Sequence, residues 1–445
     1  MLAASGSFVR LAQSGGTLML FGNDANNDAQ VIVDGNRVTV VGLNGTCVAG
    51  DNSSFDLDDA DNVFTTRLTA PVTDVAVSMR GGHDSLNIFG GNVSISGDAR
   101  INMGAGSDTL SIQNAYIGDD LVIDANNGHD TVSLLRLVVR DDVDVRGGYG
   151  DDVIGATLVR AGDDMVIKGQ SGDDALALIG TRTGDDLVVD GNAGFNGTLL
   201  VNAIAGDDVN IEGGDNEDIV VALGLRSGDD VRIDTEGGTD VVLVTGLQAR
   251  DNTRIETDSG ADLVVLADLS GTTADALLDF AGPALADIGL FGGMDDGSGM
   301  VTFEDVLNCI DVEGDLDDIL GGTLGHIGFV LADQLEAALQ PIVTDDVKID
   351  TGSGNDLVAV LGRGIYDELD VDGESGYDRL LITRGQRADD IDEDDFEVEV
   401  DEIDDIPDSI LMDLVDNASG LVPELLDAAE ALGEIPTRPT MPMMT

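Results

Sequence analysis

GDDVIGATLVRAGDDMVIKGQSGDD, residues 150–174, contains one complete period of a repeat that runs through most of this chain. A glycine stands two residues before Asp152, and the same arrangement returns 22 residues later at Asp174. A second acid, Asp164, stands ten residues before Asp174 and follows a glycine of its own. A fixed period of this length is typical of proteins in which each repeat forms one coil of a solenoid.

Two series of acidic positions follow this period. The residue two places before a first-series position is glycine everywhere except at Asn216, and these two residue types tolerate positive φ, so the slot predicts a left-handed turn. The first series is Asp84, Asp108, Asp130, Asp152, Asp174, Asn196, Asp218, Asp240, Asp262, Asp356 and Asp378, and the second is Asp74, Asp98, Asp120, Asp142, Asp164, Asp186, Asp208, Asp230, Asn252, Asp346 and Glu368.

Apolar residues alternate after each acid. They stand two and four places after a first-series acid, as Val132 and Leu134 do, and one and three places after a second-series acid, as Leu121 and Ile123 do. This alternation predicts strands with one buried face. Stacked coils would place parallel strands about 4.8 Å apart. We therefore expect an all-β fold, a right-handed parallel β-helix (β-solenoid) with 22 residues per coil, because parallel crossovers are nearly always right-handed.

The period also predicts where the segments of the chain begin and end. It is absent before residue 73, where VIVDGNRVTV (31–40) has the Asp-Gly pattern of a β-hairpin, and it lapses between Asp262 and Asp356. Helix-like sequence appears at 325–340 and 408–433. We expect an N-terminal β-hairpin cap (1–72), about nine coils of parallel β-helix (73–270), a partly helical insertion (271–343), two further coils (344–387), and an acidic segment with a helical C-terminal cap and tail (388–445).

The composition excludes several classes of function. The 445 residues carry a net charge of −66, with 87 acids and 21 bases, so nucleic acids and anionic membrane surfaces are poor partners. An apolar content of 42% excludes a disordered acidic tail. No apolar run approaches 18 residues, so we expect no membrane span. The first residues lack a secretory signal pattern, and the spacing of Cys47 and Cys309 fits no metal or redox motif and leaves their pairing open.

Stacking places like acids of neighbouring coils about 4.8 Å apart. Their repulsion is about 1 kcal/mol per pair in water and about 3 kcal/mol at an effective dielectric of 20, so over many coils it rivals the stability of a typical domain. Calcium would relieve this repulsion, because it binds six to eight carboxylate and carbonyl oxygens. The predicted ligands are Asp108, Asp120, Asp130, Asp142, Asp152, Asp164, Asp174, Asp186, Asp208, Asp218, Asp230, Asp240, Asp262 and Asp356.

One nonapeptide resembles a known family. GGYGDDVIG (147–155) matches every fixed position of the G-G-x-G-x-D-x-U-x repeat of RTX-type (hemolysin-type) calcium-binding proteins, and the segments 169–177 and 351–359 match all but one. The family repeat has nine plus nine residues per coil, whereas this chain has ten plus twelve. The layout also resembles acidic secreted β-solenoid surface proteins of marine, planctomycete-like bacteria. The resemblance implies turn ligands for calcium at Asp108, Asp130, Asp152, Asp174, Asp240, Asp262 and Asp356.

A second calcium motif is degenerate. MDDGSGMVTFED (294–305) resembles an EF-hand loop, but position 1 is Met294 and position 12 is Asp305 rather than glutamate. We therefore expect no working site there.

These observations favour a non-catalytic, calcium-binding β-solenoid that acts outside the cell or on its surface as a structural or adhesive module. Its expected partners are divalent cations, together with surface or matrix polymers or further copies of itself. One alternative is a polysaccharide-active β-helix lyase or hydrolase, in which Arg232 and Arg254 would face the substrate. Another is a salt-adapted acidic scaffold without specific ions. In a third, aspartate only suits the turns and its charge is solvated.

Overall fold

The computed structural model describes residues 7–34, 37–50, 63–67, 72–90, 93–268, 340–362, 364–383, 390–394, 396 and 398–403. Within these residues every regular element is a strand and there is no helix. The helices expected at 325–340 and 408–433 and the EF-hand-like loop at 294–305 lie outside the described residues, Gln340 excepted.

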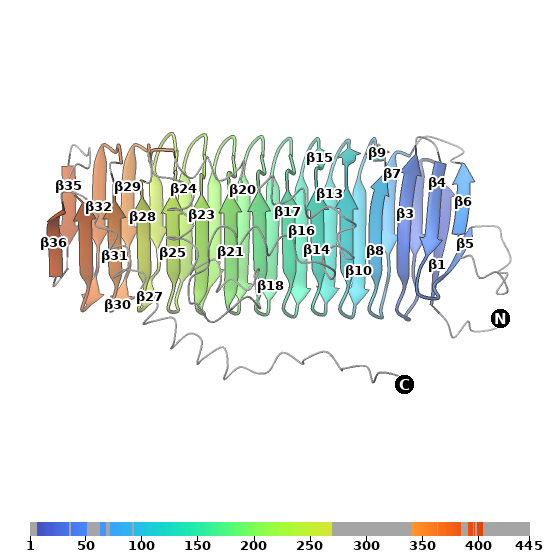
Figure 1. Cartoon of the computed structure of the whole chain (residues 1–445), viewed down its shortest axis with the longest axis horizontal. Coiled ribbons are helices and arrows are strands. Elements are labelled where there is room, and N and C mark those ends of the chain that lie inside the picture. Colours follow the sequence, from blue (N-terminus) through green and yellow to red (C-terminus); the bar gives the residue numbers. More distant parts are fainter. Residues whose placement is uncertain are drawn as a thin grey trace, which may run out of the picture.

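Two long sheets run the length of the molecule (Figure 1). Sheet A consists, in spatial order, of β35 (Asp390–Asp394), β32 (Glu368–Asp372), β29 (Asp346–Asp350), β26 (Thr253–Glu256), β24 (Val231–Glu236), β22 (Val209–Gly214), β20 (Leu187–Ala193), β18 (Met165–Ser171), β16 (Val143–Tyr149), β13 (Leu121–Asn127), β10 (Ala99–Ala105), β7 (Asp74–Ser78), β2 (Thr17–Phe21), β1 (Phe8–Ser14) and β5 (Cys47–Gly50). Sheet B consists of β36 (Val398–Ile403), β34 (Arg379–Thr383), β31 (Leu357–Leu361), β28 (Leu263–Ala267), β25 (Val241–Thr245), β23 (Asp218–Leu223), β21 (Asn196–Val201), β19 (Ala175–Ile179), β17 (Val153–Thr157), β14 (Thr131–Leu135), β11 (Thr109–Gln113), β8 (Ser85–Gly90), β3 (Asp28–Asp34), β4 (Arg37–Gly42) and β6 (Val63–Arg67).

Two small sheets complete the coils. Sheet C contains β15 (Val138–Val139), β12 (Ala115–Ile117) and β9 (Val93–Ile95), and sheet D contains β27 (Ser259–Gly260), β30 (Ser353–Gly354) and β33 (Ser375–Gly376). Each coil therefore contributes one strand to sheet A and one to sheet B. Sheet C lies where the chain passes from sheet B to sheet A and forms a short third side, whereas sheet D lies where the chain passes from sheet A to sheet B.

The strands of successive coils pair in parallel with the predicted register. Leu121 lies opposite Val143, and Val143 lies opposite Met165, so each pairing advances by the sequence period of 22. The alternating side chains separate into two groups as expected, because Leu121 and Ile123 are fully buried while Val122 between them is only half-buried. The prediction of an all-β parallel solenoid with 22 residues per coil is confirmed.

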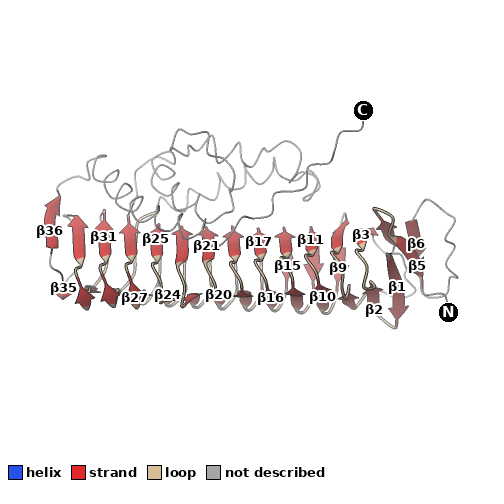
Figure 2. Ribbon diagram, turned by 90° about the horizontal axis from the view of Figure 1, so that it is seen from below, coloured by secondary structure: helices blue, strands red, loops and turns tan. Residues whose placement is uncertain are grey.

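The core lies between the two sheets, which form two layers when the molecule is viewed from below (Figure 2). The coil at 143–161 shows how one period fills it: Val143 and Val145 point inward from sheet A, Ile154 and Ala156 from sheet B, and Val159 from the short side. Burying one such valine or isoleucine contributes about 1.5–3 kcal/mol. A single coil cannot bury these faces alone, so stability depends on stacking.

The solenoid begins earlier than the repeat does. β2 pairs in parallel with β7, and β3 pairs in parallel with β8, so residues 17–33 already contribute to both long sheets. β3 and β4 then pair antiparallel, with Asp34 opposite Arg37 across the expected hairpin turn. β6 pairs antiparallel with β4 and ends this sheet.

The lapse in the period between Asp262 and Asp356 does not interrupt the stack. Leu263 in β28 lies directly opposite Leu357 in β31, and β26 pairs with β29 in the same way. The separation of 94 residues is one coil of 22 and 72 further residues. The extra residues therefore separate β28 from β29 in the sequence without shifting the register of the stack.

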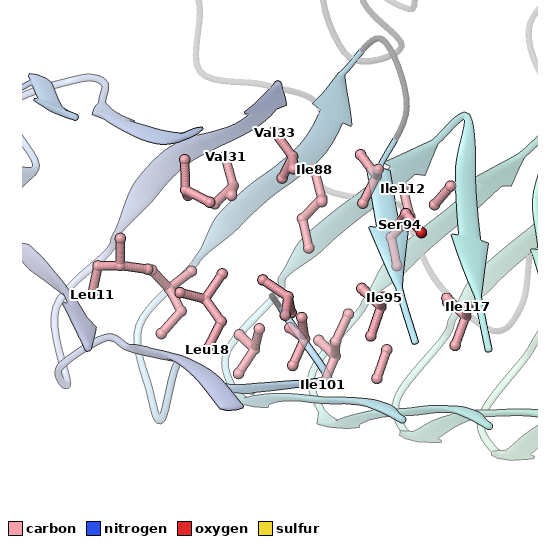
Figure 3. A pocket seen from close by; sticks show the side chains of 18 residues that line it. Leu11, Leu18, Val31, Val33, Ile88, Ser94, Ile95, Ile101, Ile112 and Ile117 are labelled. Carbon is pink, nitrogen blue, oxygen red and sulfur yellow. The ribbon is translucent and has the colours of Figure 1, made fainter. Parts of the chain in front are cut away.

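A small cavity lies inside the N-terminal coils (Figure 3). Its volume is about 40 Å³, and among its lining residues only Ser94 is polar. Aliphatic side chains from both sheets, including Leu11, Val31, Ile88 and Ile101, face it. An apolar space of this kind stays dry and offers no group for acid–base or nucleophilic chemistry.

Candidate functional site

The first-series residues form a column inside the molecule. Each of them stands in the turn before a strand of sheet B or, at Asn196 and Asp218, at the first residue of the strand, and exposes no more than 2% of its surface. Asn27 occupies the same slot one coil earlier, because Asp28 pairs with Ser85, and it is also fully buried. We call this set the inner aspartate column. Its members are Asn27, Asp84, Asp108, Asp130, Asp152, Asp174, Asn196, Asp218, Asp240, Asp262, Asp356 and Asp378.

One oxygen of each of these side chains joins two coils. The Oδ1 atom of Asp152 accepts a hydrogen bond from the backbone N–H of Asp130 at 2.7 Å, and the N–H of Asp152 donates to Oδ1 of Asp174 at 2.8 Å. The same bond is repeated from Asn27 to Asp378 with donor–acceptor distances of 2.7–3.2 Å. The column is therefore a ladder of side-chain-to-backbone bonds that fixes the spacing of the coils.

In most aspartates of the inner column, the second carboxylate oxygen, Oδ2, is buried and receives no hydrogen bond. Oδ2 has no hydrogen-bond partner in Asp84, Asp108, Asp130, Asp152 and Asp174. In Asp240, Asp262 and Asp356 the side chains of Thr235, Thr257 and Thr351 approach the carboxyl group and oppose the rise of its pKa, although no hydrogen bond of good geometry reaches Oδ2. Asp218 is the exception, since its Oδ2 accepts from the N–H of Gly214 at 2.7 Å. A buried carboxylate with an unpaired oxygen is costly, so its chemical state has to be explained.

The two asparagines indicate what that second atom faces. Nδ2 of Asn196 donates to the carbonyl oxygens of Gly194, at 3.0 Å, and Asn192, at 3.4 Å. Nδ2 of Asn27 likewise donates to the carbonyls of Ala25 and Asn23. Carbonyl oxygens accept hydrogen bonds, so this environment favours a donor. An aspartate provides a donor there only as the neutral acid, whose O–H replaces the amide N–H.

The protonation equilibria agree with this geometry. Burial, strengthened by the like charges of Asp174, Asp130 and Asp151, raises the pKa of Asp152 to about 8, although the hydrogen bond from Asp130 opposes the shift. Burial likewise raises the pKa to about 6 at Asp84 and Asp356, to about 7 at Asp108, Asp174, Asp218 and Asp262, and to about 8 at Asp240. Much of the inner column is therefore neutral below pH 7.

The second-series acids form another ladder with the opposite direction. Oδ1 of Asp164 accepts from the N–H of Asp186, one coil later rather than one coil earlier, at 3.1 Å. The pattern runs from Asp74 to Asn252 with distances of 2.8–3.4 Å. Most second-series acids are directly preceded in the sequence by a further aspartate. This preceding aspartate lies beside the ladder at the surface.

These neighbouring acids make a ridge along one corner of the solenoid. We call it the outer acid ridge. Its members are exposed or half-buried: Asp119, Asp120, Asp141, Asp142, Asp163, Asp164, Asp185, Asp186, Asp207, Asp208, Asp229, Asp230, Asp251, Asp345, Asp346, Asp367 and Glu368. Partial removal from water and the surrounding carboxylates raise the pKa values of Asp163, Asp207 and Asp251.

Three carboxylates converge at two places on this ridge. One oxygen each of Asp207, Asp208 and Asp229 lie within 4.8 Å of one another, and so do oxygens of Asp229, Asp230 and Asp251. Within the described parts of the chain, no other group of three or more potential ligands is this close. Like charges at 4.8 Å repel by about 1 kcal/mol per pair in water, and a divalent cation between them would reverse that sign.

The predicted ligands therefore fall into two separate sets. Asp120, Asp142, Asp164, Asp186, Asp208 and Asp230 lie on the outer acid ridge, while Asp108, Asp130, Asp152, Asp174, Asp218, Asp240, Asp262 and Asp356 lie in the inner column. A seven-residue strand such as β18 stands between Asp164 and Asp174 and spans roughly 23 Å, so the two sets cannot share an ion. Asp207, Asp229 and Asp251 are not among the ligands predicted from the sequence, although the Gly-Asp-Asp sequences at 206–208 and 228–230 are a signal for the first two.

The two arginines considered for polysaccharide chemistry are neutralised locally. Arg232 pairs with Asp234 and, at 3.0 Å, with Glu256, and Arg254 pairs with Glu256. On the same face of sheet A, Lys168 lies 2.7 Å from Asp190. Exposed pairs of this kind contribute little stability each, but they leave few of these cations available to a bound anion.

Fold and site together define a class: an elongated parallel β-solenoid with one buried and one exposed column of acids. Searches of family models, of curated proteins and of solved structures each returned no match for the chain. Within the described residues there is no helix of the length and apolarity that crossing a membrane requires. Cys47 is a free, half-buried thiol, and Cys309 lies outside the described residues.

Proposed function

We propose that this protein is a non-catalytic structural solenoid whose outer acid ridge binds calcium. The observation that carries the proposal is the convergence of Asp207, Asp208 and Asp229, and of Asp229, Asp230 and Asp251, within 4.8 Å at an accessible corner. Calcium takes oxygen ligands in flexible geometry and keeps waters where the protein supplies too few, so three carboxylates from neighbouring coils suit it. An ion held there would also connect successive coils.

The inner column is assigned a different role in this proposal. Its Oδ1 atoms are occupied by backbone N–H donors, and its second oxygens stand where Asn196 places an amide donor. A proton satisfies such a position with no further ligand. Calcium binding at the inner residues stays a prediction from the sequence, and replacing Asp152 by asparagine would test it.

Surface exposure of the acids supports a location where calcium is abundant. Sites with few protein ligands and ordinary surface exposure bind calcium at about 10⁻⁴–10⁻³ M, which is the range of extracellular modules. We therefore propose an extracellular or cell-surface location and a structural or adhesive role, in keeping with the RTX-type resemblance of residues 147–155. Surface polymers or other copies of the chain remain the proposed partners.

Calcium titration at constant ionic strength tests the proposal. We expect calcium at millimolar concentration to raise the unfolding temperature more than magnesium or sodium chloride does, because the ridge offers convergent carboxylates rather than a diffuse charge. The triple variant D207N/D208N/D229N should lose most of this gain. The variant D141N/D142N/D163N removes the same charge from the same ridge where no such convergence occurs, and it should keep the gain.

Two outcomes would contradict the proposal. Equal loss of the calcium effect in both triple variants would indicate a diffuse ion atmosphere rather than sites. Equal stabilisation by sodium chloride and by calcium at matched ionic strength would favour the salt-adapted scaffold instead.

A further inference from the structure

Charge is distributed unevenly within each coil. The ten residues that follow an inner-column position contain a strand of sheet B and residues of the short third side, and in eight coils they include no acid. These segments are 85–94, 109–118, 131–140, 153–162, 175–184, 197–206, 219–228 and 241–250, and they carry Arg136, Arg140, Arg160, Arg182, Arg226 and Arg250. The acids of these coils therefore lie in the inner column, on sheet A and on the outer acid ridge, whereas this half of each coil is neutral or positive.

An outward column on the short third side brings several of these residues into register. It consists, in order, of Ser94, Tyr116, Val138, Arg160, Arg182, Ile204 and Arg226, paired in parallel from coil to coil. We call this set the arginine row. It starts in sheet C, whose β9 and β15 lie at the upper edge of Figure 1. Tyr116 and Val138 each expose 44% of their surface, and Arg160 and Arg182 are exposed as well, so the row is accessible.

The arginines of the row are not neutralised by the chain. Among the residues that the structure describes, none of them makes an ion pair, and neither does Arg136 beside the row. On the outward face of sheet A, by contrast, Arg232 pairs with both Asp234 and Glu256. A guanidinium without a carboxylate partner keeps its donors available, and it can bind an external oxyanion through two parallel N–H···O bonds.

The row begins at a hollow in the surface. The hollow has a volume of about 470 Å³ and is lined by Val93, Ser94, Asn114, Ala115, Tyr116 and Arg136. These residues bring an exposed aromatic ring, a hydroxyl, an amide and a guanidinium to one place. A sugar ring has apolar C–H faces and hydroxyl groups at its edge, so a ring beside Tyr116 with polar groups around it matches this chemistry.

We propose that the hollow and the arginine row together bind a linear acidic polysaccharide. One sugar lies against Tyr116 in the hollow, and anionic groups further along the polymer meet Arg160 and Arg182. An extended polymer suits the row because its members follow one another in a line, about 4.8 Å apart from coil to coil. This proposal names the class of surface polymer within the proposed function and rests on it for the location of the protein, but the contacts need no calcium.

Nucleic acid fits the row less well. Duplex DNA carries one charge per about 1.7 Å of its axis, whereas the row offers at most one guanidinium per coil of about 4.8 Å. The remaining phosphates would lie beside the outer acid ridge, because Asp163 follows Arg160 by only three residues. A polysaccharide with one anionic group on each sugar or disaccharide spaces its charges more widely.

Binding of fluorescent oligosaccharides to the full chain, in chelator at fixed ionic strength, tests the proposal. An oligogalacturonate or a sulfated dextran of matched length should bind, and neutral dextran should not; the two acidic probes distinguish carboxylate from sulfate recognition. R160A/R182A should weaken binding about tenfold or more, because two charge-assisted contacts are lost. R232A/R254A removes the same charge where both arginines are already paired, and it should leave the affinity unchanged. Y116A alters no charge and should also weaken binding.

Circular dichroism should show the same β-sheet content in each variant, and R160Q/R182Q gives the same test if the alanine variant folds poorly. Failure of both acidic oligosaccharides to bind would overturn the proposal. So would an equal loss of affinity in R160A/R182A and R232A/R254A, or an oligonucleotide of matched length that binds as tightly as the polysaccharide. The calcium sites are judged separately, by the effect of D207N/D208N/D229N on stabilisation by calcium, so either proposal can fail without the other.

Discussion

Replacing Asp152 by asparagine should stabilise the protein at neutral and alkaline pH. The side chain is 1% exposed, and its Oδ1 already accepts from the N–H of Asp130, a bond that asparagine keeps. Asparagine also adds an amide donor. At the equivalent position two coils later, Nδ2 of Asn196 donates to the carbonyl oxygen of Gly194 at 3.0 Å. The substitution therefore removes only the need for the carboxyl group of residue 152 to be protonated in the folded chain.

The sign and size of the effect follow from the pKa values. Asp152 has a pKa of about 8 in the folded chain against an ordinary value of 3.8, so between these values the folded state binds more protons than the unfolded state. Its contribution to stability therefore falls as pH rises from about 4 to about 8 and is level beyond. At 1.36 kcal/mol per pKa unit, the cost at pH 7 has an upper limit of about 4 kcal/mol.

The assay is denaturant unfolding of wild type and D152N with chelator present, from pH 4 to pH 9. The two proteins should have similar stability near pH 4, and the variant should become progressively more stable up to pH 8. Hydrogen exchange at the coils around residue 152 would localise the effect, because solenoids need not unfold as one unit.

Two results would refute this reasoning. One is a wild-type stability that rises between pH 4 and pH 8 in the absence of metal. The other is a destabilised D152N at pH 8. If D152N instead weakened stabilisation by added calcium, Asp152 would be a metal ligand as its turn motif predicts.

Three further predictions use other features of the chain. Asn196→Asp removes the donor to the Gly194 carbonyl and should destabilise the protein at pH 8 but much less at pH 4, as measured by the same unfolding series. Gly169→Ala should cost about 1–3 kcal/mol, because its Cβ would lie 2.3 Å from Oδ2 of Asp174, whereas Gly155→Ala, whose nearest neighbour is at 3.9 Å, should be close to neutral. Raising sodium chloride at fixed pH should increase the unfolding temperature without calcium, since screening weakens the repulsion of a chain with a net charge of −66.

Much of the fold could be predicted because the repeat acts locally. The alternation at Leu121 and Ile123, repeated every 22 residues, specifies which face of each strand is buried, and stacking then follows from the period. The period could not show that β28 pairs with β31, because 72 inserted residues hide their relation in the sequence. Asn27 is hidden as the first member of the inner column because 57 residues, rather than 22, separate it from Asp84.

The candidate site was less predictable than the fold. Asp164 and Asp174 both follow turn glycines, so the sequence treats them alike, yet Asp174 is buried between coils and Asp164 is partly exposed. Burial depends on how the turn of one coil sits against the next, which no local pattern encodes. The asparagine at 196 was a usable signal, because asparagine resembles a neutral carboxylic acid more closely than a charged ligand.

The opposed directions of the two ladders bear on how such a chain changes length during evolution. In the coils that contain Asp98 to Asp230, each coil donates one backbone N–H and supplies one side-chain oxygen to each ladder, so duplicating or deleting a unit of 22 residues recreates all of these bonds at the new junction. Any other number of residues would misalign both corners at once unless the register of the strands was kept across the excess, as it is between β28 and β29. Natural variants of this molecule should therefore differ by whole coils, or by excursions that begin and end at the tip of a strand.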